Sequence, residues 1–268
     1  MPAVYRGFNV TMEPLLQANN QELYDIGANL FAAQKRQVRH SLRELVLTNG
    51  SLDGAALQAQ WFPLVEADVF ISHSHTDAET VVILAGLLRK FFGISCFTDT
   101  TVWGYGATLL RKLDGEHCTN GPDSYSYEAR NLSTSHVYLM LAGALSKMID
   151  RTECVFFLNS PASVEPGLVM NATLSPWLYF EVLSTQLVRK RQPSDHLARQ
   201  QTIQKSFSDT GEKLITEALT MTHQIELGHL TPLHLSAAFF RRWLAQAAGY
   251  QFRLDALYRL CPQSTTYV

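Results

Sequence analysis

The chain has 268 residues, of which 46% are hydrophobic and 17% are charged, and its net charge is −2. This hydrophobic content is ordinary for a globular protein, which excludes disorder as the main state. Lys and Arg do not outnumber Asp and Glu, which argues against electrostatic capture of nucleic acid or of an anionic membrane. A prior of about 150 residues per domain predicts one enlarged domain or one domain with an extension.

The cysteines and the apolar runs bear on the compartment. Four cysteines lie far apart without a CxxC pair, which predicts reduced thiols in a cytoplasm and neither a disulfide framework nor a metal site. The first residues contain no continuous apolar stretch typical of a signal peptide. The longest apolar runs fall far short of the ~20 residues that a membrane span requires, so we expect a cytoplasmic protein without a transmembrane helix.

The first third of the chain has a helical pattern. Residues 20–46 carry apolar side chains at mostly helical intervals with charges between them, which predicts a long amphipathic helix. Residues 48–54, rich in Gly, Ser, Asn and Asp, indicate a loop, and Pro63 ends a short element after it. We therefore interpret residues 1–66 as an N-terminal helical extension.

An alternation of strands and helices follows. Residues 68–72 form a β-prone run, and the range Thr76–Glu79 has the form of a capping box that opens a helix. Gly93 is a typical helix terminator, and residues 94–98 predict the second strand. Strand, helix and strand in this order favour a parallel pair.

A third unit comes after a polar insertion at residues 114–135. It consists of a predicted helix at 137–149 and a predicted strand at 154–158. Ser175 as N-cap and Pro176 at the first helical position then predict a helix that reaches about residue 191.

The pattern is weaker beyond residue 191. Residues 221–233 predict one or two further strands, and residues 235–248 and 252–260 predict helices. Taken together, the elements predict an α/β domain at residues 67–268 with a doubly wound parallel sheet, made of a core at 68–191 and a C-terminal portion at 192–268.

Polar residues follow each predicted core strand. Ligands of doubly wound sheets bind outside the carboxyl ends of the strands, near the point where the strand order reverses. These ends carry the residues His73, Ser74 and His75 after the first strand, Asp99 after the second, and Asn159 and Ser160 after the third. Each could be an ordinary loop or turn residue, but their collection at one sheet edge favours a binding site.

Two further patterns add to this site. The segment from Asp99 to Gly106 mixes Trp103 and a tyrosine with two glycines, the composition of a mobile lid over a flat ligand. Trp177 and Glu181 lie four residues apart on a predicted helix and therefore share a face. A Trp in the core with a Glu in water is the ordinary alternative for such a pair.

These segments together resemble one protein family. The run Asp68-Val-Phe-Ile-Ser-His-Ser-His75 resembles the opening strand of Toll/interleukin-1 receptor (TIR) domains. Cys96-Phe-Thr-Asp99 with Trp103 and Gly106 resembles their second strand and BB loop, and Ser175-Pro-Trp-Leu-Tyr-Phe-Glu181 resembles their Ser-x-Trp motif before a glutamate. The resemblance covers about residues 68–191 and is closest to bacterial TIR-like proteins of anti-phage defence.

The resemblance implies a flavodoxin-like sheet and an enzyme that cleaves NAD+ at the nicotinamide–ribose bond. It implies Glu181 as the catalytic carboxylate and Trp177 as a wall of the pocket. Further implied contacts to NAD+ come from His73, Ser74, His75, Asp99, Trp103 and Gly106. NAD+ would be the substrate, and no cofactor or metal is implied. The products would be nicotinamide and ADP-ribose, a cyclic isomer or a conjugate, and the sequence does not choose among them.

A single carboxylate fits this chemistry. Nicotinamide in NAD+ is already a cationic leaving group, so no general acid is needed to expel it, unlike ordinary glycoside cleavage with two carboxyl groups. Glu181 would stabilise the positive charge that develops on the ribose. Two alternatives remain open: a non-enzymatic TIR scaffold that assembles through its BB loop, and an enzyme similar to nucleoside deoxyribosyltransferases. The implied partners are NAD+, further copies of the chain, and a downstream effector or a phage-derived activator.

Overall fold

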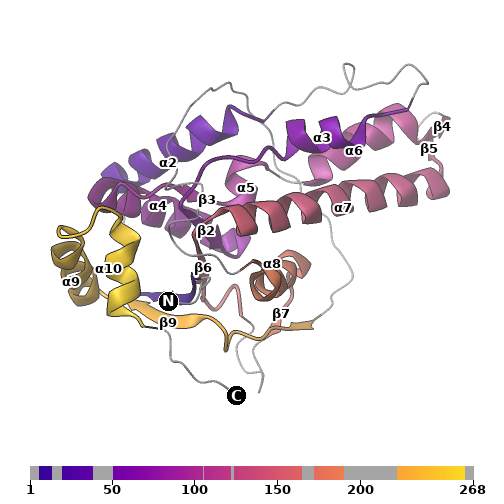
Figure 1. The fold of residues 1–268 in the computed structure, drawn as a ribbon. Helices are drawn as coiled ribbons and strands as arrows, with labels where there is room; N and C mark the ends of the chain where they lie inside the picture. The colour runs from indigo at the N-terminus through magenta and orange to yellow at the C-terminus, as the bar shows by residue number, and fades with distance from the viewer. Residues whose placement is uncertain are drawn as a thin grey trace.

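The structure is a computed structural model that describes residues 6–13, 20–38, 51–104, 106–121, 124–164, 172–189 and 222–262. Within these residues a five-stranded sheet has the order β3-β2-β6-β1-β9 (Figure 1). Every pair of neighbouring strands in it is parallel. The strands are β1 (Arg6–Met12), β2 (Val69–Ser72), β3 (Cys96–Phe97), β6 (Cys154–Leu158) and β9 (Thr231–Leu235). The predicted α/β class with a parallel sheet is thus confirmed.

Helices cover the sheet on two faces. The connections from β1 to β2 and from β2 to β3 run one way along the sheet, and those from β3 to β6 and from β6 to β9 run the other way. Right-handed crossovers therefore place α2 (Gln21–Lys35) and α4 (Ala78–Phe92) on one face, and α7 (Tyr127–Arg151) and α8 (Pro176–Leu187) on the opposite face. In Figure 1 α2 lies along α4, and α7 and α8 lie on the other side of the strands.

Two glycines set the close packing of α2 on α4. A Cβ atom on Gly27 would lie 2.0 Å from the Val82 carbonyl oxygen, and one on Gly86 would lie 1.8 Å from the Leu23 carbonyl oxygen. No side chain fits at either position, so the two helix backbones meet directly. The sequence pattern does not reveal this contact, because from sequence alone a glycine within a helix indicates only a weak helix former.

The structure corrects the predicted N-terminal extension. Residues 6–12 form β1, which pairs with β6 on one side and with β9 on the other. Phe8 and Val10 point into the core, while Asn9 and Thr11 are less buried. The helix predicted at 20–46 is α2, which ends at Lys35, and residues 39–46 lie outside the described residues. The boundary predicted at residue 66 therefore falls inside the domain.

The predicted insertion at 114–135 is mostly regular structure. It contains the end of α6 (Gly106–His117), a hairpin of β4 (Thr119–Gly121) and β5 (Ser124–Tyr125), and the first part of α7. Helix α7 begins at Tyr127, well before the predicted residue 137, because Ser126 acts as N-cap and accepts a hydrogen bond from the Ala129 amide.

The remaining elements follow the predicted order. The short element before Pro63 is α3 (Gly54–Trp61), and Gly93 ends α4 in the left-handed conformation, with φ 69°. Strands β7 (Ala172–Thr173) and β8 (His223–Gln224) form a separate antiparallel pair. The two predicted C-terminal helices are α9 (Ala237–Ala247) and α10 (Arg253–Leu260). In the part of the chain that the structure describes, no helix has the length and apolar character needed to cross a membrane.

Candidate functional site

The strand order places a reversal between β2 and β6. The chain leaves β2 toward β3 on one side and later returns to β6 on the other, so the loops after these two strands separate. A crevice at the carboxyl edge of such a pair is where ligands of doubly wound sheets bind. Here the hydroxyl of Ser160, after β6, donates a hydrogen bond of 2.6 Å to the Asp77 carboxylate, after β2, and ties the two loops together.

Glu181 lies at this edge and is held by Ser72. The Ser72 hydroxyl at the end of β2 donates a hydrogen bond of 2.5 Å to Oε2 of Glu181 on α8. Only 3% of Glu181 is exposed to solvent. The position of α8 is fixed by Ser175, whose hydroxyl accepts a hydrogen bond from the Leu178 amide, and by Pro176 at the first helical position. The predicted start of this helix is confirmed.

The environment of Glu181 favours its neutral form. Burial raises the pKa of its carboxyl group well above the ordinary value, and the nearby Asp99 carboxylate raises it further. The hydrogen bond from Ser72 opposes these effects, because it favours the charged form. A carboxyl group whose pKa is raised by burial and by a neighbouring charge is typical of catalytic acids and bases.

His73 is the second buried titratable side chain of the site. Only 5% of it is exposed, and its Nδ1 lies 3.4 Å from the carbonyl oxygen of Ile71. Its Nε2 is buried and has no hydrogen-bond partner among the described residues. Burial lowers the pKa of the imidazole, while the charge of Asp99 acts in the opposite direction. Asp99 thus interacts electrostatically with both His73 and Glu181.

We name Ser72, His73, Asp99 and Glu181 the edge cluster. The sequence predicts three of its members, and the structure brings these three together around β2, β3 and α8. The sequence does not predict Ser72, because a serine at the end of an apolar strand cannot be told from an ordinary turn residue. The signal that was available is the fully buried strand itself, since a hydroxyl on it must find a partner.

Two predicted neighbours lie at the rim of the edge cluster. Ser74 is half-buried, and its hydroxyl lies 3.2 Å from the hydroxyl of Thr76. His75 is exposed and begins a short 3-10 turn, η2 (His75–Asp77). Both follow β2 directly, at the carboxyl edge of the sheet.

The structure places two other predicted site residues in the core, which corrects the expected lid. Trp103 is 3% exposed, and its indole N–H donates a hydrogen bond of 2.9 Å to the Pro63 carbonyl oxygen. Its ring packs on Phe97. Gly106 opens α6, where an added Cβ would lie 3.2 Å from a methyl group of Leu141. The short helix α5 (Asp99–Val102) follows β3 at once and keeps Trp103 against the sheet.

Trp177 lies toward α7. Its ring centroid lies 5.6 Å from that of Tyr138, and its half-buried side chain packs on the hydrophobic core. Although Trp177 and Glu181 are one turn apart on α8, the described contacts of Glu181 are to β2 and those of Trp177 are to α7. The expected aromatic wall next to the carboxyl group is thus turned toward the neighbouring helix.

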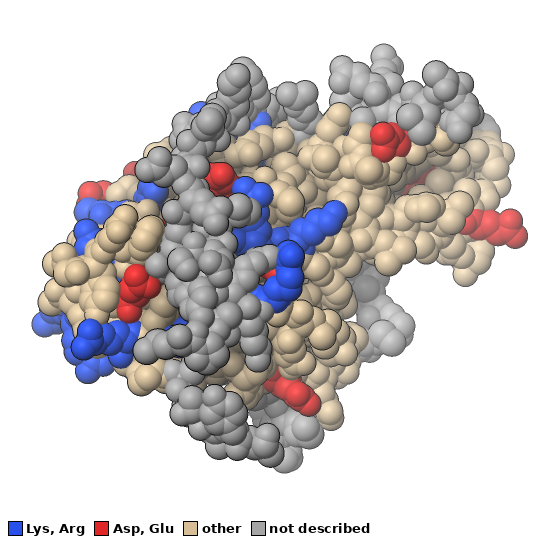
Figure 2. All heavy atoms as spheres, in the orientation of Figure 1, with Lys and Arg blue, Asp and Glu red and all other residues tan. Residues whose placement is uncertain are grey.

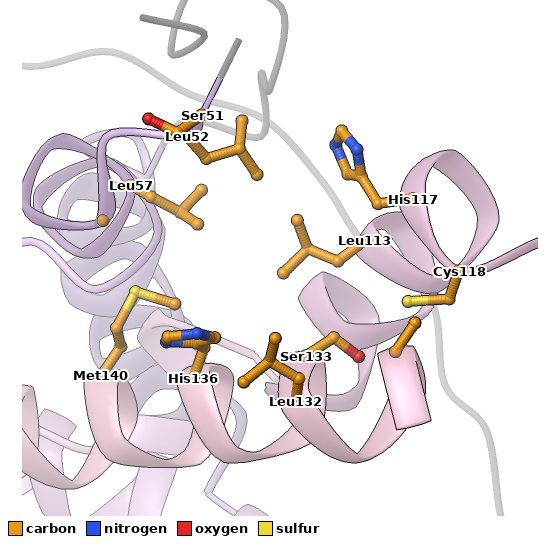
Figure 3. Close-up of a pocket in the computed structure, with 12 residues that line it drawn as sticks. Ser51, Leu52, Leu57, Leu113, His117, Cys118, Leu132, Ser133, His136 and Met140 are labelled. Carbon is orange, nitrogen blue, oxygen red and sulfur yellow. The ribbon is translucent and has the colours of Figure 1, made fainter. Parts of the chain in front are cut away.

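A large cavity lies elsewhere in the molecule. It measures about 600 Å³ and is bounded by α3, α6 and α7 (Figure 3). Its walls are mostly apolar, and the polar side chains on them include His117 and His136. Figure 3 shows Leu57, Leu113 and Met140 around the hollow. No member of the edge cluster lines this cavity.

Comparison of the chain with known proteins gave no match among family models, curated proteins or solved structures. No group of three or more His, Cys, Asp or Glu side chains in the described ranges is arranged to hold a metal ion. The edge cluster itself offers a buried carboxyl group whose pKa is raised, a hydroxyl that donates to it, and a buried imidazole whose pKa is lowered.

Proposed function

We propose that the protein is a TIR-like enzyme with a flavodoxin-like core that cleaves the nicotinamide–ribose bond of NAD+ and uses Glu181 as its catalytic carboxyl group. In this proposal the products are nicotinamide and ADP-ribose, or a cyclic or conjugated form of ADP-ribose. The proposal places the enzyme in the cytoplasm of a bacterium, where it acts in anti-phage immunity, as the sequence resemblance implies.

One observation carries the proposal. The glutamate of the predicted TIR motif is buried at the reversal point of the sheet, with a hydroxyl from β2 on its carboxyl group. A charged side chain is seldom buried without a functional or structural reason, and a perturbed carboxyl group in a crevice is typical of an active site. With β1 set aside, β2, β3 and β6 have the arrangement of the first three strands in flavodoxin-like sheets, while β1 lies between β6 and β9.

The raised pKa of Glu181 is compatible with a role as a carboxylate. NAD+ carries a positive charge on its nicotinamide ring, and an opposite charge within a few ångströms favours the ionised form of a carboxyl group. Binding of NAD+ next to Glu181 would thus lower the pKa of its carboxyl group. The ionised group would then stabilise the positive charge that develops on the ribose as nicotinamide leaves.

The test is the release of nicotinamide from NAD+, measured by chromatography on the full chain and on Glu181→Gln. The variant should lower the rate at least about 100-fold, as the loss of a group that stabilises transition-state charge does. The assay uses high protein concentration, because the resemblance implies an active site built in an assembly. Glu128→Gln, an exposed glutamate in the first turn of α7, is the matched control and should keep the full rate. Equal rates for wild type and Glu181→Gln would exclude Glu181 from the mechanism.

A second candidate is a scaffold that acts only by self-association. Helix α7 exposes large apolar side chains, including Leu139, which is 72% exposed, and Tyr127. Figure 2 shows a surface without charged residues along the middle of α7, with charged residues toward both ends of the helix and further Lys and Arg near α9 and α10. A scaffold predicts that Leu139→Glu abolishes assembly in sedimentation experiments. It also predicts that Glu181→Gln leaves cellular activity intact, which the enzyme proposal excludes.

A further inference from the structure

The unpartnered Nε2 of His73 is a feature that the proposed reaction does not by itself explain. Most buried polar atoms in proteins have a hydrogen-bond partner, and a buried atom without one carries a cost in stability. This nitrogen is buried and has no partner among the described residues, although the side chain lies within the edge cluster. A bound ligand that forms a hydrogen bond with Nε2 would remove this cost in stability.

The contact of the other ring nitrogen fixes what that partner must be. Nδ1 faces the Ile71 carbonyl oxygen at 3.4 Å, and a carbonyl oxygen can only accept a hydrogen bond. This contact assigns the ring proton to Nδ1. Burial disfavours the charged form, in which both ring nitrogens would carry a proton. Nε2 therefore presents a lone pair and can only accept a hydrogen bond.

The neighbouring side chains do not supply the missing donor. The Ser72 hydroxyl already donates its proton to Glu181. Asp99, whose charge reaches both His73 and Glu181, is an acceptor when ionised. Neither described neighbour offers a free donor, and a ligand that enters the edge cluster would supply one.

A phosphate or carboxylate group of a ligand carries only acceptor oxygens when ionised and would be repelled by this lone pair. A sugar hydroxyl donates readily. We propose that His73 Nε2 accepts a hydrogen bond from a ribose hydroxyl of the substrate, and that the phosphates of the substrate lie away from His73. This assignment rests on the proposed function, because it is the ribose next to Glu181 that offers the hydroxyl. It narrows the expectation from sequence, in which the segment His73 to His75 contacts phosphates and ribose together.

The test compares two substitutions that separate the two ring nitrogens. In His73→Asn the amide N–H lies near the position of Nδ1 and the acceptor at Nε2 is lost, whereas in His73→Gln the amide oxygen reaches the position of Nε2. The probe is carba-NAD, a non-cleavable analogue that keeps the ribose hydroxyls, and its binding to the full chain is measured by calorimetry. His73→Asn should weaken binding about tenfold or more, and His73→Gln should remain within about threefold of wild type.

Inorganic pyrophosphate is the second probe. Its binding should be the same in wild type and in both variants, and a loss in His73→Asn equal to that of carba-NAD would overturn the assignment in favour of a phosphate contact. His136→Asn, an exposed histidine on α7, is the matched control and should bind carba-NAD like wild type.

Two measurements on the unaltered chain keep the test independent of variant folding. Carba-NAD analogues that lack the 2′- or the 3′-hydroxyl of the nicotinamide ribose should include one that binds about tenfold more weakly. Nitrogen NMR of the imidazole should show an unprotonated Nε2 in the free protein, and a protonated Nε2 would overturn the assignment. If carba-NAD binds neither to the wild type nor to any variant, both the proposed function and the ribose contact are overturned. Binding that His73→Asn leaves unchanged overturns the ribose contact alone.

Discussion

The edge cluster and the cavity between α3, α6 and α7 differ in the kind of side chain that each contains. The cavity measures about 600 Å³, and its walls are mostly apolar. The edge cluster instead buries a glutamate, a histidine and a serine together. Burial of such groups costs stability, whereas an apolar wall contributes to it. In the proposed function the chemistry lies at the edge cluster, where the fold buries polar groups at a cost, and not at the large hollow.

The largest effect on stability is expected at the cavity wall. Leu57→Ala should lower the free energy of unfolding by about 2–5 kcal/mol, because Leu57 is 2% exposed and packs in the main core. Leu132→Ala is the matched control on the same cavity and should change it by less than about 0.5 kcal/mol, since Leu132 is 61% exposed. Denaturant unfolding measures both. Equal losses would show that the two sides of the cavity are packed alike and would remove the contrast.

A smaller effect is expected within the edge cluster. Ser72→Ala should lower the free energy of unfolding by about 1–3 kcal/mol, because it leaves the buried carboxyl group of Glu181 without its donor. Ser74→Ala should change it by less than about 0.5 kcal/mol, because Ser74 is only half-buried and its hydroxyl contacts Thr76. A Ser72→Ala protein as stable as wild type in urea would mean that the hydrogen bond contributes nothing.

The pH dependence of stability reports on Glu181. Its pKa is raised in the folded protein, so the folded state holds a proton that the unfolded state releases above the ordinary value of 4.5. The stabilisation by this proton is complete below that value and is lost as pH rises through the folded pKa, with a slope of at most about 1.4 kcal/mol per pH unit.

Glu181→Gln should remove this dependence, so the variant gains stability relative to wild type as pH rises above 4.5. In Asp99→Asn the loss of stability with rising pH should end at a lower pH than in wild type, because the Asp99 charge contributes to the raised pKa of Glu181 in the folded protein. Denaturant midpoints measured across the pH range give both results. Parallel curves for wild type and Glu181→Gln would show that Glu181 is ionised in the folded protein.

The smallest effect is expected from filling the cavity. Ala129→Leu adds apolar atoms to a residue of its wall and should raise the free energy of unfolding by about 0.5–1 kcal/mol. Thermal unfolding of the variant is the measurement. A fall in stability would indicate that the space is already occupied in solution.

Much of the fold could be predicted from local sequence. The strand β2 is an uninterrupted apolar run, and Gly93 and Ser175 are ordinary helix-end signals that the structure confirms. The strand β1 was missed because its alternating polar residues leave only a short apolar pattern, and its partners lie far away in the chain. Local periodicity carries no information about which distant strand completes a sheet.

The edge cluster could be predicted only in part, because local sequence does not show which distant residues meet. Glu181 and His73 each follow from a local pattern, but the hydrogen bond between Ser72 and Glu181 joins residues that are 109 positions apart. The mixture of aromatics and glycines in the segment from Asp99 to Gly106 predicts a lid, whereas the short helix that begins at Asp99 places Trp103 in the core. Tertiary packing decided both positions, and no single segment contains that information.

The place of β1 in the sheet also bears on how the protein is made. Its two neighbours, β6 and β9, follow it at long range, and Thr11 beside His234 spans 223 positions. While the chain is synthesised, both edges of β1 therefore stay unpaired until β6 has emerged, and one edge stays unpaired until β9 has emerged. Closure of such long loops is slow compared with the formation of helices. We expect the sheet to be completed late, so that the newly made chain depends on protection from aggregation for longer than a protein built of local hairpins.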